Sequence, residues 1–260
     1  MRVETRSQSV DVQAKVVVGA DGRSSTIRKL MGAEFEYELH NVDVLWFVFD
    51  RPPNYGQVYN LFVAGDHSYL ILPKHPNKLQ CGMLFRPGTF VPQRKRGIEE
   101  FKQLLSKAHP VFAKFAETIT DFTPFTLLQG KASFVRQWAS DGCLLIGDAA
   151  HCCSPAGGIG VSVALATALV AAETLVLALE RGDTSQAFLS RVQQRRSKEI
   201  RWLHRKQFAF TGIFVTRLAL TRRIVPWLLP LVRPFGLMNR KASEMLTQAP
   251  LPLEVPLSVP

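Results

Sequence analysis

Two short sequences rich in glycine and aspartate could bind a ligand. Residues 19–22 read GADG and follow an apolar run, VVV, at 16–18. Residues 147–151 read GDAAH and follow LLI at 144–146, and SPAGGIG occupies 154–160. Glycine lets a backbone approach a ligand closely, and carboxylate oxygens accept hydrogen bonds from hydroxyl groups. Both sequences are therefore candidate ligand-binding turns.

Each turn lies between an expected strand and an expected helix. Ser24 or Ser25 can cap the helix SSTIRKLM after the first turn, and Gly32 can end it. The second turn leads into a long helix over about residues 158–180, whose N-terminus carries partial positive charge and suits an electron-rich ring atom. Asp21 could equally be a simple turn residue. The first turn alone is only suggestive.

Together the two motifs resemble those of FAD-dependent monooxygenases of the p-hydroxybenzoate hydroxylase type. Members of that family carry GADGxxSxxR and, after an antiparallel sheet, GDAAHxxxPxxGxGxNxAxxDA. The first pattern is met at Gly19, Ala20, Asp21, Gly22, Ser25 and Arg28. The second is met at Gly147, Asp148, Ala149, Ala150, His151, Pro155, Gly158, Gly160, Ala164 and Ala168. Three positions depart from the family: Ile159 replaces Gln, Ser162 replaces Asn and Thr167 replaces Asp.

The resemblance implies FAD as the cofactor, with Asp148 near the ribityl chain or pyrophosphate and residues 155–162 along the isoalloxazine ring. The expected cofactor-binding residues are Asp21, Gly22, Arg28, Gly147, Asp148, Pro155, Gly158, Ile159, Gly160, Val161 and Ser162. Arg23 and Arg28 could meet phosphate or lie on a helix surface. The resemblance identifies no catalytic acid or base, because substrate contacts vary within this family.

The implied reaction is hydroxylation of a small organic substrate, aromatic compounds included. In it NADH or NADPH reduces FAD, and O₂ supplies the oxygen atom. Two alternatives stay open. One is a non-catalytic remnant or interaction module with the same fold. The other is a related flavin reductase, epoxidase or halogenase.

The family begins with a strand-GxGxxG-helix unit that binds the ADP pyrophosphate, and this sequence contains no GxGxxG. We therefore expect a truncated, split or decayed flavoprotein, and a separately encoded N-terminal FAD-binding half is a candidate partner.

The fold class expected is α/β (α+β): a partial Rossmann-like FAD-binding domain, an antiparallel-sheet substrate domain and a helical C-terminal tail. The start of the chain, 1–22, suggests a hairpin whose second arm is a buried strand at 15–18. Strand-like runs fill 41–90, a helical period follows over 97–120, and 125–137 look extended. The expected segments are 1–35 and 138–182 for FAD binding, 36–137 for the substrate sheet, and 183–260 for a basic helical tail.

The net charge of +11 is concentrated near the C-terminus. Between Arg191 and Lys241 there are 13 Lys or Arg residues and one acidic residue, Glu199. We expect a solvated helix face. Peripheral membrane contact through the tail from Trp202 to Leu237 is the second possibility. Nucleic-acid binding is not expected, because no recognised module accompanies the charge.

The segment 156–179 is long and apolar enough to span a bilayer. Its many small side chains and its position after a strand nevertheless favour a buried helix that is covered on both sides. The four cysteines form no disulfide framework, and the N-terminus has no apolar signal region, so a cytoplasmic protein is expected. His151, Cys152 and Cys153 lack metal-ligand spacing, so no metal site is expected.

Overall fold

A computed structural model describes residues 2–4, 8–56 and 58–215 of this chain. The described residues divide into two compact units. Unit 1 contains the chain up to Leu39 together with Ala132–Lys206. Unit 2 contains His40–Lys131 together with residues 207–215. The part of the predicted tail beyond residue 215 lies outside the described residues.

Unit 1 has a small sheet ordered β3-β10-β9, formed by β3 (Val17–Gly19), β10 (Cys143–Leu145) and β9 (Ala139–Ser140). β3 and β10 are parallel, with Leu145 opposite Gly19, whereas β9 is antiparallel to β10. A side chain at Gly19 would place its Cβ 2.7 Å from Leu145 Cδ2 and 2.9 Å from Ile27 Cβ. Glycine is therefore required here for close packing of β3, β10 and the following helix.

The expected N-terminal hairpin exists, but it has different strands. It pairs β1 (Arg2–Glu4) with β2 (Ser9–Asp11), whereas β3 pairs in parallel with β10. The interpretation of residues 15–18 as the second arm of this hairpin is therefore wrong. The apolar run contacts a strand more than a hundred residues away, which local alternation cannot reveal.

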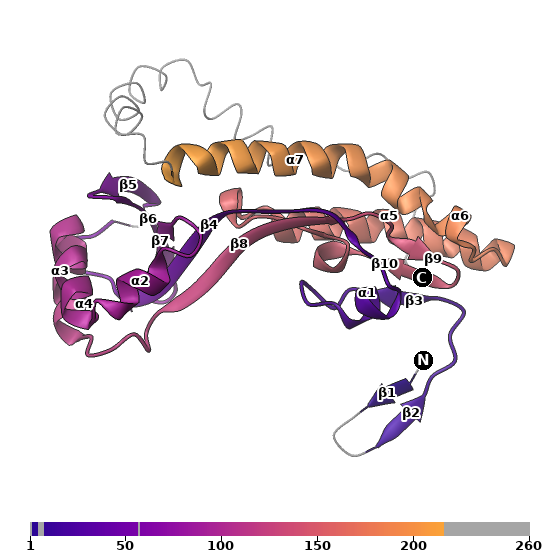
Figure 1. The fold of residues 1–260 in the computed structure, drawn as a ribbon, viewed down its shortest axis with the longest axis horizontal. Helices are drawn as coiled ribbons and strands as arrows, with labels where there is room; N and C mark the ends of the chain where they lie inside the picture. The colour runs from indigo at the N-terminus through magenta and orange to yellow at the C-terminus, as the bar shows by residue number, and fades with distance from the viewer. Residues whose placement is uncertain (1, 5–7, 57, 216–260) are drawn as a thin grey trace. The chain divides into compact units, whose positions relative to one another are not determined.

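Besides the short helix α1 (Thr26–Leu30), unit 1 contains α5 (Gly160–Arg181), α6 (Gln186–Leu189) and α7 (Arg191–Val215), the last continuing into unit 2. Gly182, at φ 68°, ends α5, and Ser185 caps α6 by accepting a hydrogen bond from the Phe188 amide. The buried side chains of α5, α6 and α7 share one apolar core with Trp138, Leu144 and Leu145. The predicted long helix is confirmed as α5 (Figure 1). Its buried side chains belong to this core.

Unit 2 is built on antiparallel strands, as predicted. They are β4 (Phe35–Asp50), β7 (Lys78–Phe85), β6 (His67–Lys74) and β5 (Asn60–Ala64), adjacent in that order. The full strand order is β11-β8-β4-β7-β6-β5, with β8 (Thr126–Val135) and β11 (His151–Cys152). β4 and β8 each contribute residues to both units.

One face of the unit 2 sheet carries a core of aromatic and aliphatic side chains, including Leu45, Phe47, Tyr69 and Met83. Helices α2 (Phe90–Lys95), α3 (Ile98–Ala108) and α4 (Ala113–Thr118), with the 3₁₀ turn η1 (Pro110–Phe112), add their apolar side chains to this core. On the opposite face Trp46 lies across from Gly82, and a Cβ at Gly82 would be 2.8 Å from the indole. The glycine therefore provides the room in which the indole lies.

Candidate functional site

The structure brings the two predicted turns together at one edge of the unit 1 sheet. GADG begins at the last residue of β3, and GDAAH follows β10. The two strands are joined there by the Ile146 amide, which donates to the Gly19 carbonyl oxygen at 2.9 Å. Because β3 and β10 are parallel and adjacent, Asp21 and Asp148 both follow the carboxyl ends of these strands. Ligands of open α/β sheets bind at this edge. The site is assembled from residues far apart in the sequence.

Arg28 joins the two turns. Its Nη1 donates to the Ala149 carbonyl oxygen at 3.1 Å, and its Nη2 donates to the Arg23 carbonyl oxygen at 2.8 Å. The guanidinium also lies 4.5 Å from the centre of the Phe35 ring. Arg28 is only 6% exposed, so it does not lie on the helix surface. It fixes the backbone of both motifs.

A second cross-motif contact joins Arg23 and Cys152, since Arg23 Nε donates to Cys152 Sγ at 3.0 Å. Burial raises the pKa of the Cys152 thiol, and the Arg23 hydrogen bond opposes this shift. Burial also raises the pKa of Cys153 to about 12. Both sulfurs are therefore thiols rather than thiolates at neutral pH, which makes them poor nucleophiles.

Asp21 binds the start of helix α1 (Thr26–Leu30). Its carboxylate accepts hydrogen bonds from the Thr26 amide at 2.6 Å and the Ile27 amide at 3.1 Å. Burial tends to raise the pKa of Asp21, but hydrogen bonds from Ser25 and these amides lower it below its usual 3.8. Ser25 is the N-cap, as predicted, and accepts from the Arg28 amide at 2.9 Å. Asp21 thus has a structural role at the turn, and it stays exposed beside Gly22.

The second turn is mostly buried at GDAAH and exposed at Gly157 and Gly158. Gly147 begins the 3₁₀ turn η2 (Gly147–Ala149) with φ 57°, and Asp148 is half-buried. Pro155 precedes the 3₁₀ turn η3 (Ala156–Gly158), in which Gly157 and Gly158 have φ of 81° and 65°. Such backbone angles favour glycine.

The residues that enter α5 point in different directions. Ile159 is buried in the unit 1 core, and a Cβ at Gly160 would lie 3.7 Å from the Cys153 Cβ. Gly158, Val161 and Ser162 are exposed. In the part of the chain that the structure describes, no side chain caps the first turn of α5, so its leading amides are available to an acceptor.

Sequence reasoning missed a buried hydrogen-bond cluster behind this turn. The Thr167 hydroxyl donates to the Val163 carbonyl oxygen at 3.0 Å and lies 2.9 Å from His151 Nε2. Since its one hydrogen is used, Thr167 accepts from His151 Nε2–H and from Arg196 Nε at 3.4 Å. Burial lowers the pKa of His151 to about 3, so the ring is neutral. The family pattern marks position 167, but only as a lost aspartate.

Tyr37 and His204 form a neighbouring buried pair in unit 1, with Tyr37 Oη 3.0 Å from His204 Nδ1. Burial raises the pKa of Tyr37 to about 12 and lowers the pKa of His204 to about 4. Both side chains of this pair are therefore neutral at pH 7. His204 Nε2 and His151 Nδ1 have no hydrogen-bond partner among the described residues.

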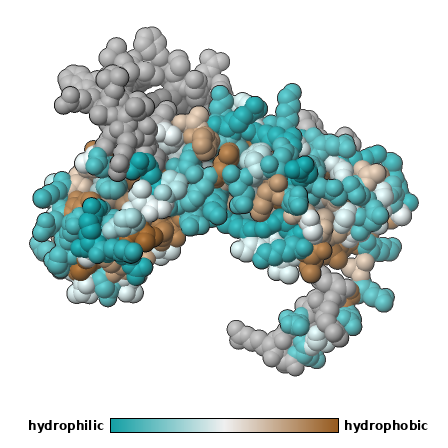
Figure 2. All heavy atoms as spheres, in the orientation of Figure 1, coloured by the Kyte–Doolittle hydropathy of each residue, from teal (hydrophilic) through white to brown (hydrophobic). Residues whose placement is uncertain are grey.

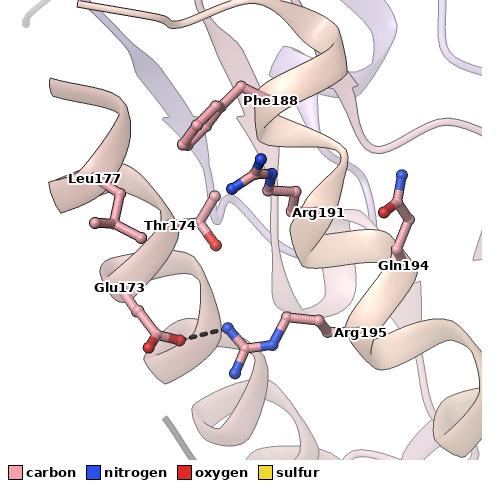
Figure 3. A pocket seen from close by; sticks show the side chains of 7 residues that line it. All are labelled: Glu173, Thr174, Leu177, Phe188, Arg191, Gln194 and Arg195. Carbon is pink, nitrogen blue, oxygen red and sulfur yellow. Dashed lines mark hydrogen bonds and ion pairs between the residues drawn. The ribbon is translucent and has the colours of Figure 1, made fainter. Parts of the chain in front are cut away.

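A separate pocket of about 200 Å³ lies between α5 and the α6–α7 segment (Figure 3). Its side chains come from Glu173, Thr174, Leu177, Phe188, Arg191, Gln194 and Arg195. Glu173 is buried and forms an ion pair with Arg195, and Arg191 lies 4.2 Å above the Phe188 ring. None of the predicted cofactor-binding residues lines this pocket.

Comparison with known proteins agrees with this geometry. The model of a family described as an FAD binding domain matches residues 1–206. The 6-methylpretetramide 4-monooxygenase of Streptomyces rimosus is 36% identical over 190 residues, covering 72% of this chain and 45% of that protein. Digeranylgeranylglycerophospholipid reductase 2 of Methanopyrus kandleri is 27% identical over 208 residues, covering 73% of this chain and 48% of that protein.

Solved structures share the fold. A variant of HpxO from Klebsiella pneumoniae, in complex with FAD, has a TM-score of 0.68 at 16% identity and covers 94% of this chain and 64% of that one. CabE, an aromatic hydroxylase from angucycline biosynthesis, has a TM-score of 0.65 at 18% identity. The match covers 94% of this chain and 49% of CabE. This chain spans about half the length of the curated relatives it matches. The match over residues 1–206, together with the paired turns at adjacent parallel strands, shows that this chain belongs to the FAD binding domain family.

Proposed function

We propose that this chain forms the C-terminal part of an FAD-dependent, NADH- or NADPH-using monooxygenase that hydroxylates a small organic substrate, aromatic compounds included. The observation that carries the proposal is the convergence of GADG and GDAAH at adjacent parallel strand ends. The chemistry supplied by bound FAD is uptake of a hydride from the nicotinamide and activation of O₂. One oxygen atom enters the substrate and the other leaves as water.

The residues present fit one side of such a cofactor. A Cβ added at Gly158 would meet nothing within 4 Å, so a flat ring can approach this backbone. The uncapped amides at the start of α5 suit an electron-rich ring atom. We assign the ring contacts to Pro155, Gly158, Val161 and Ser162, with Ile159 and Gly160 shaping the turn behind them.

Asp148 is the residue we assign to the ribityl or pyrophosphate side, since it follows the β10 end beside Gly147. Asp21, Gly22 and Arg28 support the site by fixing the neighbouring turn. The remaining pyrophosphate contacts would come from a GxGxxG half outside this sequence. A cytoplasmic location goes with this proposal.

FAD titration tests the assignment. We expect this chain, mixed with a polypeptide that carries the strand-GxGxxG-helix unit of this family, to perturb the FAD visible spectrum. Asp148→Ala should weaken binding about tenfold or more, as expected for a lost charge-assisted hydrogen bond. Asp66→Ala, an exposed aspartate in the β5–β6 turn, is the control and should bind as the parent does. A colourless mixture, or equal loss in both variants, would refute the assignment.

A flavin reductase is the second candidate. It is favoured by the similarity to the Methanopyrus kandleri reductase, which covers about the same share of this chain as the monooxygenase does. The two functions differ in the fate of oxygen. A hydroxylase consumes O₂ with NAD(P)H and incorporates labelled oxygen into product, whereas a reductase transfers hydride to the substrate without incorporation.

A further inference from the structure

Helix α5 is packed on one side only among the described residues. Val163, Val170 and Ala178 belong to the unit 1 core, whereas Leu165 and Leu169 are 62% and 43% exposed. The expectation that this helix is covered on both sides is therefore met on one side alone. Figure 2 shows apolar patches that interrupt the hydrophilic surface of the chain.

The C-terminal half of α5 carries a buried charge on its packed side. Ala156–Arg181 is long and apolar enough to cross a membrane, yet it contains Glu173, which is 1% exposed and forms an ion pair with Arg195 of α7. Figure 3 shows these two side chains facing each other. The pair fixes α5 against α7 within unit 1 and forms part of the lining of the pocket of about 200 Å³.

Arg191 of α7 also lines this pocket, and its guanidinium lies 4.2 Å from the centre of the Phe188 ring. Unlike Arg195, Arg191 has no carboxylate partner and donates no side-chain hydrogen bond among the described residues. A guanidinium that lies against an aromatic ring keeps its N–H donors directed outward in its own plane. The Thr174 hydroxyl donates to the Val170 carbonyl oxygen at 2.8 Å, so Arg191 rather than Thr174 is the donor for a ligand.

The lining of the pocket carries one net positive charge, because Arg191 and Arg195 are cationic and Glu173 is anionic. The other lining side chains are neutral. Outside the lining, Arg181 and Asp183 interact electrostatically with each other, so their charges cancel. A ligand with a single negative charge therefore matches the pocket, whereas a dianion would bring an uncompensated charge close to the Glu173 carboxylate.

The size and the apolar part of the lining limit the rest of the ligand. Leu177 is half-buried and Phe188 is only 6% exposed, so they provide an apolar wall beside the charged groups. A cavity of roughly 150 Å³ accepts a benzene ring, so a pocket of about 200 Å³ has room for one ring and a carboxylate. A dinucleotide such as FAD is far larger than this volume. Because Arg191 is exposed, a carboxylate bound to it would stay in contact with water.

We propose that the pocket between α5 and the α6–α7 segment is a binding site for a small monocarboxylate whose apolar body is about the size of one ring. Arg191 binds the carboxylate through its planar fork of N–H donors, which matches two carboxylate oxygens. The apolar body lies against Leu177 and Phe188. None of the predicted cofactor-binding residues lines this pocket, so the inference is independent of the proposed function.

Titration of the purified chain with benzoate, followed by ligand-observed NMR, tests the site without FAD. We expect a Kd of about 1 mM, which is ordinary for so small a ligand. Arg191→Met keeps an unbranched side chain beside Phe188 but removes the carboxylate-binding group, so it should weaken binding about tenfold or more. Arg191→Lys keeps the charge without the fork and should fall between the two. Arg181→Met is the matched control, because Arg181 is also exposed and lies 5.8 Å from the same ring but does not line the pocket. It should bind benzoate as the parent does.

Two further ligands separate this site from a simple anion patch and from a simple apolar cavity. Inorganic phosphate carries the charge without the apolar body, and benzyl alcohol carries the ring without the charge. Each should bind at least about tenfold more weakly than benzoate. Circular dichroism confirms that the parent and each variant are folded. The proposal is overturned by a folded chain that does not bind benzoate, by equal weakening in Arg191→Met and Arg181→Met, or by phosphate or benzyl alcohol binding as tightly as benzoate.

Discussion

Arg28 and Ala149 lie 121 residues apart in sequence, yet the Arg28 guanidinium donates to the Ala149 carbonyl oxygen at 3.1 Å. This bond ties the helix that follows GADG to the turn that contains GDAAH. Arg28 is therefore a structural link between the two motifs. It would influence cofactor binding by fixing the position of one motif relative to the other.

Replacing Arg28 with methionine tests this link. The variant leaves the Ala149 and Arg23 carbonyl oxygens without their buried donor, and we expect the free energy of unfolding to fall by about 2–4 kcal/mol. Urea denaturation measures the change. Lys29→Met changes an exposed neighbour on α1 and should have little effect. Equal stability of the two variants would contradict the link.

Thr167 offers a second test, because its hydroxyl accepts from His151 and donates to Val163. Thr167→Val keeps the shape but leaves the buried His151 Nε2–H without its acceptor, which should cost about 1–3 kcal/mol of unfolding free energy. Thr167→Ser keeps the hydroxyl and should recover most of that loss in thermal denaturation. If valine were as stable as threonine, the hydrogen bond would not matter.

Local patterns predicted the parts of this fold that depend on neighbouring residues. Alternating apolar residues identified the strands of unit 2, and the serines after GADG identified the cap that Ser25 provides. The pairing of the two motifs came from the family resemblance, and β3 lying beside β10 agrees with it.

Features that depend on distant partners were not predictable. The acceptor of Arg28 is a backbone carbonyl, which leaves no trace in side-chain identity. The hairpin interpretation of residues 15–18 failed for the same reason, because the parallel partner of β3 is β10, a strand far away in the sequence. The sequence of α5 is apolar on nearly every side, so composition could not distinguish its packed face from exposed side chains such as Leu165 and Leu169.

The pairing of Trp46 with Gly82 makes a prediction in unit 2. Gly82→Ala would bring a methyl group to 2.8 Å from the Trp46 ring, so the indole must move. We expect a loss of about 1–3 kcal/mol of unfolding free energy, as in overpacked sites. The double variant Trp46→Leu, Gly82→Ala should lose less than the sum of the two single variants. Gly56→Ala, whose Cβ would be 3.7 Å from Val58, is the control. Additive losses would show that the two residues are not in contact.

Buried histidines predict acid sensitivity. Burial lowers the pKa of His151 from 6.5 to about 3 and that of His204 from 6.5 to about 4. Below pH 6.5 the unfolded chain therefore binds protons that the folded chain does not, and stability falls as pH decreases. Each such proton contributes a slope of about 1.4 kcal/mol per pH unit, which for His204 ends near pH 4 and for His151 near pH 3. Urea unfolding between pH 7 and about 4.5 measures the slope.

A substitution identifies which histidine is responsible. His204→Gln retains an acceptor for the Tyr37 hydroxyl but cannot titrate, so it should remove about one proton from the slope between pH 6.5 and about 4. His75→Gln, an exposed histidine between β6 and β7, should leave the slope unchanged. If His204→Gln left the slope as in the parent while His75→Gln reduced it, the acid sensitivity would come from the surface rather than from the core of unit 1. Above about pH 5, where a carboxyl with a lowered pKa such as Asp21 stays ionised in both states, the slope that remains in His204→Gln belongs to His151, whose ring nitrogen donates to Thr167. Since a charged His151 would have to stay buried beside Arg196, this remainder should persist at high salt, which screens surface charges far more than buried ones.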